Sequence, residues 1–89
     1  MQKKILYLTL HKKWFDEIVS GKKKIEYRDI KPYWTKRLFD KDGKPKDYNL
    51  IFFRNGYSKD CPKMFVEFKG VLISDKYEIL LGAVRRVKS

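Results

Sequence analysis

The amino-acid sequence predicts a mainly β fold of the α+β class, a small, strongly curved five-stranded β-barrel or sheet with two short α-helices covering an opening. Three observations predict it. Most apolar segments alternate with a period of two, which is typical of strands with one buried face. Glycines inside two of these segments indicate bulges or bends. Strands and helices do not alternate regularly along the chain, which argues against a doubly wound parallel sheet.

Size and composition narrow the class of protein. The 89 residues predict a single domain over residues 1–89, and 43% hydrophobic residues suffice for a packed core although 37% are charged. No apolar run approaches the roughly 18–20 residues of a membrane span, and the apolar run after Lys4 lacks the cleavage site of a signal peptide. One cysteine, Cys61, suits a reducing cytosol and excludes a cysteine-rich zinc site. We therefore expect a monomeric, cytoplasmic protein without membrane contact, metal or cofactor.

The first strand and the first helix follow each other directly. Residues 3–10 form the strand, and helical spacing begins at His11 or Lys12. The helix carries one apolar stripe, formed by Trp14, Phe15, Ile18 and Val19. Ser20 and Gly21 end it, and we expect Gly21 to adopt the left-handed conformation of a helix cap.

The middle of the chain is more polar. A charged strand runs from the glycine cap to about Asp29, and Pro32 separates it from a short helix over residues 33–39. Residues 40–47 combine aspartate, glycine, lysine and proline, and we expect an exposed loop.

Three strands complete the predicted sheet. Residues 48–54 are nearly all apolar, which predicts burial on both faces, and Asn55-Gly56 indicates a turn. Residues 64–74 and 77–87 alternate, with Gly70 and Gly82 as the expected bends.

The charged strand gives the strongest functional signal. Because alternate residues of a strand point to opposite faces, Lys24, Glu26 and Arg28 share one face. Ile25 and Tyr27 share the other face, which we expect to enter the core. The charged face then carries a compact ionic cluster, either as a solvated surface or as the floor of a polar binding site.

The charge balance favours an anionic partner. The formal net charge is +11, and lysine and arginine on one surface release counterions from phosphates. The excess is spread along the chain and no arginine-rich tail stands apart. Charge alone therefore leaves a nucleic acid and an acidic protein as alternatives.

The motif Gly-x-Lys-x-x-Glu-x-Arg is matched by Gly21, Lys23, Glu26 and Arg28, directly after a Leu-x-Leu strand and an amphipathic helix. In this order the elements resemble the ASCH domain, a relative of the PUA RNA-binding domain, most clearly over residues 5–29. The resemblance implies a PUA-like β-barrel with a cleft beside the motif, and RNA or a nucleotide-like molecule as the ligand.

One branch of the family resembles hydrolases that remove the acetyl group of N4-acetylcytidine with a lysine, a threonine and a glutamate. Lys23 matches the lysine, whereas Glu26 occupies the threonine position. The helical insert that carries the glutamate is replaced by residues 74–76. A binding module for RNA or a nucleotide is therefore our leading interpretation. The alternatives are an amidohydrolase that uses Lys23 and Glu26, and an interaction domain for an acidic protein.

The candidate ligand-binding residues follow from the motif. Arg28 can form two parallel hydrogen bonds to a phosphate or carboxylate, and Lys23 can attract an anion as a point charge. Glu26 can accept hydrogen bonds from an exocyclic amine. His11 starts the helix after the first strand, and the aromatic pair after Pro32 either packs on the barrel or stacks on a base. The further candidates are Lys24, His11, Tyr33, Trp34, Arg54 and Asn55.

Overall fold

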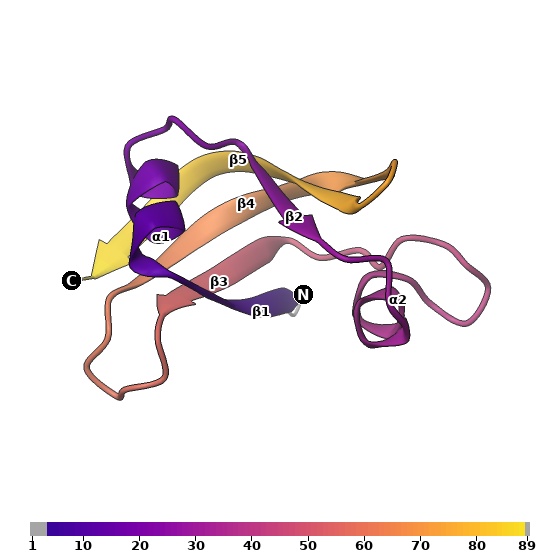
Figure 1. The fold of residues 1–89 in the computed structure, drawn as a ribbon, viewed down its shortest axis with the longest axis horizontal. Coiled ribbons are helices and arrows are strands. Elements are labelled where there is room, and N and C mark those ends of the chain that lie inside the picture. Colours follow the sequence, from indigo (N-terminus) through magenta and orange to yellow (C-terminus); the bar gives the residue numbers. More distant parts are fainter. Residues whose placement is uncertain (1–3, 89) are drawn as a thin grey trace.

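The computed structural model describes residues 4–88, with the backbone alone for residues 86–88, and its elements confirm a mainly β fold with two helices (Figure 1). In chain order these are β1 (Ile5–Leu10), α1 (Lys12–Val19), β2 (Ile25–Arg28), α2 (Pro32–Leu38), β3 (Leu50–Asn55), β4 (Lys63–Ile73) and β5 (Tyr77–Lys88). Lys3, with which we expected the first strand to begin, lies outside the described residues. The loop over residues 40–47 is largely exposed, as predicted.

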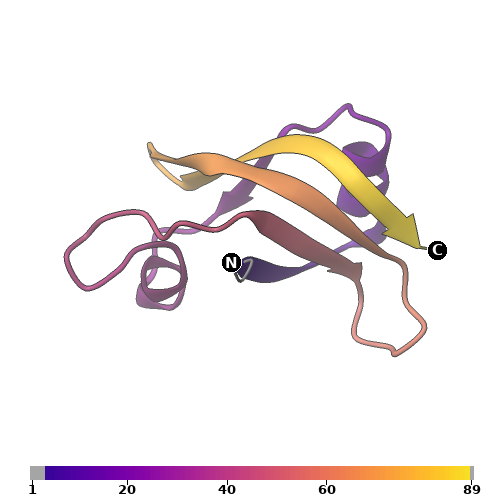
Figure 2. The same ribbon diagram turned by 180° about the vertical axis from the view of Figure 1, so that it is seen from behind.

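The strands form one sheet in the order β1-β3-β4-β5-β2, which curls into a half-barrel. β1 runs parallel to β3, and the other neighbours are antiparallel. Both helices lie on the side of the sheet that faces the viewer in Figure 1, at opposite ends. From behind, β3, β4 and β5 form the near surface (Figure 2). β1 and β2 are therefore the two edges of the sheet, and within the described chain no backbone ladder joins them.

Both predicted bends coincide with irregular strand pairing. The register of β4 against β5 shifts between Phe68 and Gly70, and again beside Gly82. A Cβ atom at Gly82 would lie 2.9 Å from the Cβ of Glu67, so the two strands approach too closely there for a side chain. These shifts let the long β4–β5 pair coil around the core.

The core lies inside the curled sheet. Its buried residues show that the prediction of a strand buried on both faces was wrong. β3 begins at Leu50 and is fully buried on one face only, at Ile51 and Phe53. Phe52 is half-buried on the outer face because it packs against the rings of Tyr7 and Phe65. The buried hydrophobic residues are Leu6, Leu8, Leu10, Phe15, Ile18, Leu38, Ile51, Phe53, Met64, Val66, Tyr77, Ile79 and Leu81.

β2 is oriented opposite to our prediction. Tyr27, expected in the core, is 48% exposed, and Ile25 is half-buried. Glu26 is the inward residue, with 6% of its surface exposed. A carboxylate can lie at such a position only if cations and hydrogen bonds compensate its lost hydration.

Gly21 turns the chain from α1 into β2, as predicted. Its φ is +84°, its N–H donates to the carbonyl of Ile18, and the N–H of Lys22 donates to that of Glu17. This pair of bonds is the Schellman motif, which satisfies the last carbonyls of a helix. The turn places Lys23, two residues after Gly21, just before β2.

An exposed ion pair ties the end of β2 to the β4–β5 hairpin. The Nζ of Lys76 lies 2.8 Å from Oδ1 of Asp29. The hydrogen bond from Lys76, together with its charge, holds the pKa of Asp29 below its usual value and raises that of Lys76. None of the helices in the described residues is long and apolar enough to cross a membrane.

We expect Gly21→Ala to lower the unfolding free energy by about 1–2 kcal/mol, because a Cβ is strained at a positive φ. Gly21→Asn is the matched control, since asparagine tolerates the left-handed region better. Urea denaturation followed by circular dichroism measures both. A Gly21→Ala protein as stable as Gly21→Asn would contradict the capping role.

We expect the stability difference between wild type and Lys76→Met to shrink in acid. The lowered pKa of Asp29 means that the stabilisation by Lys76 is complete above the usual aspartate pKa of 3.8 and is lost as the pH falls through the lowered value. Urea midpoints at neutral pH and at about pH 2 measure it. A difference that grows in acid would contradict the assignment.

Candidate functional site

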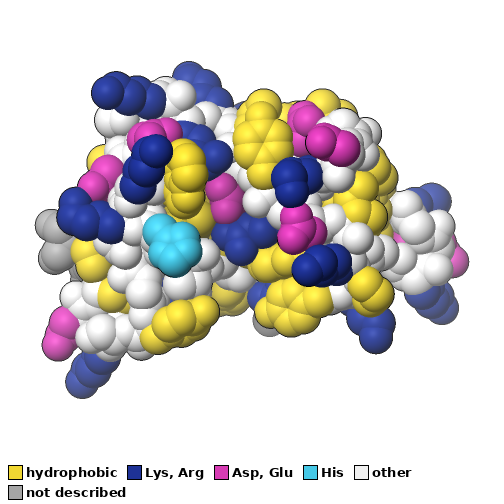
Figure 3. All heavy atoms as spheres, viewed as in Figure 1, with side chains coloured by type: hydrophobic (Ala, Val, Ile, Leu, Met, Phe, Trp, Pro, Cys, Tyr) yellow, Lys and Arg dark blue, Asp and Glu magenta, His cyan; other side chains and the backbone are white. Residues whose placement is uncertain are grey.

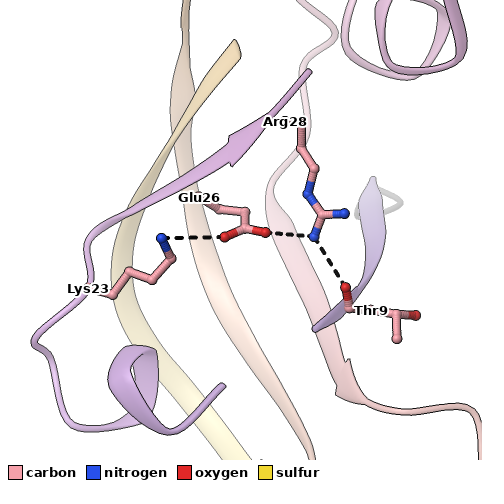
Figure 4. A network of polar contacts seen from close by, with 4 residues as sticks. All are labelled: Thr9, Lys23, Glu26 and Arg28. Atoms are coloured by element: carbon pink, nitrogen blue, oxygen red, sulfur yellow. Dashed lines mark hydrogen bonds and ion pairs between the residues drawn. The ribbon is translucent and has the colours of Figure 1, made fainter. Parts of the chain in front are cut away.

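The polar centre of the molecule is built around the buried carboxylate of Glu26. Its Oε2 accepts a 2.6 Å hydrogen bond from Nη2 of Arg28, and its Oε1 lies 3.6 Å from Nζ of Lys23. The same Nη2 of Arg28 also donates to the main-chain carbonyl of Thr9 at 3.2 Å. Figure 4 shows this chain of contacts running from Lys23, just before β2, to Thr9 on β1. We call Lys23, Glu26 and Arg28 the ionic clasp.

The ionic clasp joins the two edges of the sheet. Arg28 belongs to β2 and Thr9 to β1, and no backbone ladder links these strands in the described residues. The free carbonyl of an edge strand needs a donor, and the guanidinium supplies it. Because two cations face one carboxylate, the clasp carries a net positive charge.

A cavity of about 440 Å³ opens above the clasp, on the face seen in Figure 3. In that view acidic and basic side chains fill the hollow between hydrophobic ones, next to the histidine in cyan. The cavity combines elements from both edges of the sheet with both helices and the β3–β4 loop. It is lined by Thr9, Leu10, His11, Trp14, Glu26, Tyr27, Arg28, Asp29, Trp34, Gly56 and Tyr57.

Aromatic rings wall the cavity, and cations lie against them. Nζ of Lys23 is 5.0 Å from the centre of the Trp14 ring and 5.1 Å from that of Tyr27. Cζ of Arg28 is 4.8 Å from the ring centre of Trp34. Such contacts fix both rings and cations without a rigid hydrogen bond. The cavity therefore offers flat hydrophobic surfaces beside a positively charged floor.

The two oxygens of the Glu26 carboxylate differ in their partners. Oε2 of Glu26 is taken by Arg28, whereas Oε1 makes no hydrogen bond to the described residues, since Lys23 is 3.6 Å away. Nε of Arg28 is buried without a partner. A carboxylate oxygen with a free lone pair accepts an amine or ring N–H. Within residues 4–88, no three histidine, cysteine, aspartate or glutamate side chains are grouped to hold a metal ion.

The structure brings together four of the predicted site residues. Glu26, Arg28, His11 and Trp34 all line the cavity. Lys23 lies behind them, between the rings and the carboxylate. The first strand, the first helix and the motif strand follow one another in the sequence, and in the structure they meet at one cavity.

The other predicted residues lie outside the lining. Lys24 is exposed, and Tyr33 lies on α2 with 61% of its surface exposed. Arg54 turns into the β3–β4 loop, where its Nη2 donates to the carbonyls of Tyr57 and Ser58. It therefore holds in place the loop that carries Tyr57 to the cavity. Asn55 ends β3 and its side chain is not part of the lining.

Sequence reasoning missed three aromatic residues of the cavity: Trp14, Tyr27 and Tyr57. Trp14 belongs to the apolar stripe of α1, but only Phe15 and Ile18 of that stripe are buried. The apolar stripe of α1 is wider than the face that the helix buries. This width was the signal in the sequence that one of its members could line a cavity. Tyr57 follows a turn and had no signal of its own.

In comparison with known proteins, the family model of the ASCH domain matches residues 8–78, which include the end of β1, the motif, both helices and the start of β5. No curated protein and no solved structure matches significantly.

We expect Arg28→Met to lower the unfolding free energy by about 3 kcal/mol or more, because it leaves a buried carboxylate without its hydrogen-bonded partner. The double variant Glu26→Leu/Arg28→Met removes the carboxylate together with the arginine, so no unpaired charge is left buried. The double variant should therefore be more stable than Arg28→Met alone. Urea denaturation measures both values.

The control is Lys12→Met, which breaks an ion pair with Asp16 that is also 2.6 Å long but exposed. Its effect should stay below about 1 kcal/mol, as is usual at a surface. Glu26→Leu alone completes the double-mutant cycle. A double variant destabilised by the sum of the Glu26→Leu and Arg28→Met effects would show that Glu26 and Arg28 do not interact.

Proposed function

The chain belongs to the ASCH domain family, whose members are PUA-like domains of the RNA-binding type, and we propose that it binds RNA or a nucleotide-sized ligand in the cavity above the ionic clasp. One unpaired base enters between the aromatic walls. Arg28 and the net positive charge of the clasp favour a phosphate, and Oε1 of Glu26 accepts a hydrogen bond from the base edge.

One observation carries the proposal: the rings of Trp14, Tyr27 and Trp34 surround a cavity whose floor is an arginine and a carboxylate. Unpaired bases are held by stacking on aromatic rings and by hydrogen bonds to their edges. A cavity of about 440 Å³ is within the usual size of small-molecule sites. The net charge of +11 adds a general attraction for phosphates.

The enzymatic alternative has less support in the geometry. Lys23 is not part of the cavity lining, and its Nζ is held by the two rings and by Glu26. In this geometry Lys23 positions the two rings and the carboxylate. Binding of an acidic protein would need only the lysine-rich surface, and the test below separates it from base recognition.

We expect Trp14→Leu to weaken binding of a short fluorescein-labelled single-stranded RNA about tenfold, because one stacking surface is lost. Trp14 is 39% exposed, so the fold should tolerate the change. Tyr7→Leu is the matched control, since Tyr7 is exposed on β1 and does not line the cavity. Fluorescence anisotropy at low and moderate salt measures the dissociation constants.

The difference between the two variants should persist at moderate salt, because stacking does not depend on counterion release. Equal affinities for Trp14→Leu and Tyr7→Leu would contradict the proposal. Displacement of the RNA by inorganic polyphosphate, equally well from all three proteins, would instead indicate a surface for acidic partners.

A further inference from the structure

We propose that the exposed face of α2 is a second nucleotide subsite, in which Tyr33 and Arg37 hold the nucleotide next to the one in the cavity. This inference rests on the proposed function and extends it. The preferred ligand is then a single-stranded stretch of nucleotides and not an isolated nucleotide.

The aromatic wall of the cavity continues onto α2. Trp34 lines the cavity, and its ring meets that of Tyr33 edge to face with centres 4.9 Å apart. Tyr33 is 61% exposed, so most of its ring is accessible beside the cavity. Arg37 lies on the same face of the helix because it follows Tyr33 by four residues, and its Cζ is 5.2 Å from the Tyr33 ring centre.

Arg37 differs from Arg28 in having no carboxylate partner. Arg28 is paired with Glu26, whereas no acidic group lies within 4.0 Å of the Arg37 guanidinium in the described part of the chain. Its charge is therefore uncompensated.

The guanidinium of Arg37 is also fixed in place. Its Nη2 donates to the main-chain carbonyl of Tyr7 at 3.3 Å, which anchors α2 to the free edge of β1. A guanidinium has five N–H donors. Nε of Arg37 is buried, so the donors left for a ligand are those of the two Nη groups that the bond to Tyr7 does not use. A positioned, unpaired arginine binds phosphate well.

Together the two side chains match one nucleotide. An exposed ring supplies a stacking surface for a base, and the neighbouring arginine supplies a cation for its phosphate. Both side chains also contact Trp34, which lines the cavity: the Tyr33 ring meets it edge to face, and Cζ of Arg37 lies 5.8 Å from its ring centre. A single strand can therefore pass from the cavity across α2.

The test compares a nucleoside monophosphate with the matching trinucleotide by isothermal titration calorimetry, for the base that binds best among the four. Wild type should bind the trinucleotide about tenfold more tightly than the mononucleotide, as one further stacked base predicts. Tyr33→Leu and Arg37→Gln should each lose most of this gain and leave the mononucleotide affinity unchanged. Lys36→Gln, an exposed neighbour on α2, is the charge control and should keep the gain.

The outcomes are distinguishable. If the mononucleotide binds but Tyr33→Leu keeps the full gain of the trinucleotide, α2 serves only to hold the fold and this inference is wrong. The same conclusion follows if Lys36→Gln loses as much as Arg37→Gln. If Trp14→Leu does not weaken the mononucleotide, the proposed function fails, and the second subsite fails with it. Should Arg37→Gln not fold, Tyr33→Leu alone decides.

Discussion

The fold depends on one buried carboxylate that joins the two edges of an open sheet. Glu26 points into the half-barrel, where hydrophobic side chains would ordinarily be expected, and it is tolerated because Arg28 and Lys23 compensate its charge. Arg28 then reaches the carbonyl of Thr9 on the opposite edge. In a closed barrel, backbone hydrogen bonds would join these two edge strands. Here the guanidinium of Arg28 joins them instead, and this leaves room for a cavity beside it.

Closure of the sheet and formation of the cavity therefore have a common cause. A continuous ladder between β1 and β2 would fill the space in which the cavity lies. The side-chain contact keeps the edges apart, exposes the clasp to the cavity and lets rings from α1, β2 and α2 stand around it. Arg37 makes a similar contact with β1: its guanidinium donates to the carbonyl of Tyr7, two residues before Thr9.

Strands, helices and bends could largely be predicted from the sequence, because they follow from local periodicity and from glycine positions. The grouping of Glu26 and Arg28 on one face also followed from strand geometry. Which face of β2 points inward could not be predicted, because apolar Tyr27 normally outweighs a carboxylate. Part of the compensation comes from Lys23, outside the strand, and Arg28 is oriented by the Thr9 carbonyl on another strand. The role of Trp14 was hidden for a similar reason, since an apolar stripe does not show which of its members remains exposed.

The most direct test of the account is an NMR titration of the isotope-labelled protein with a short single-stranded RNA, following backbone amides and the Arg28 Nε–H signal at low and moderate salt. The account predicts that the largest shifts fall on residues 9–11, 14, 26–29 and 34, that Arg28 Nε–H is among them, and that they persist at moderate salt. Shifts scattered over exposed lysines, lost with salt and leaving Arg28 Nε–H unchanged, would contradict it, because they would show only counterion release.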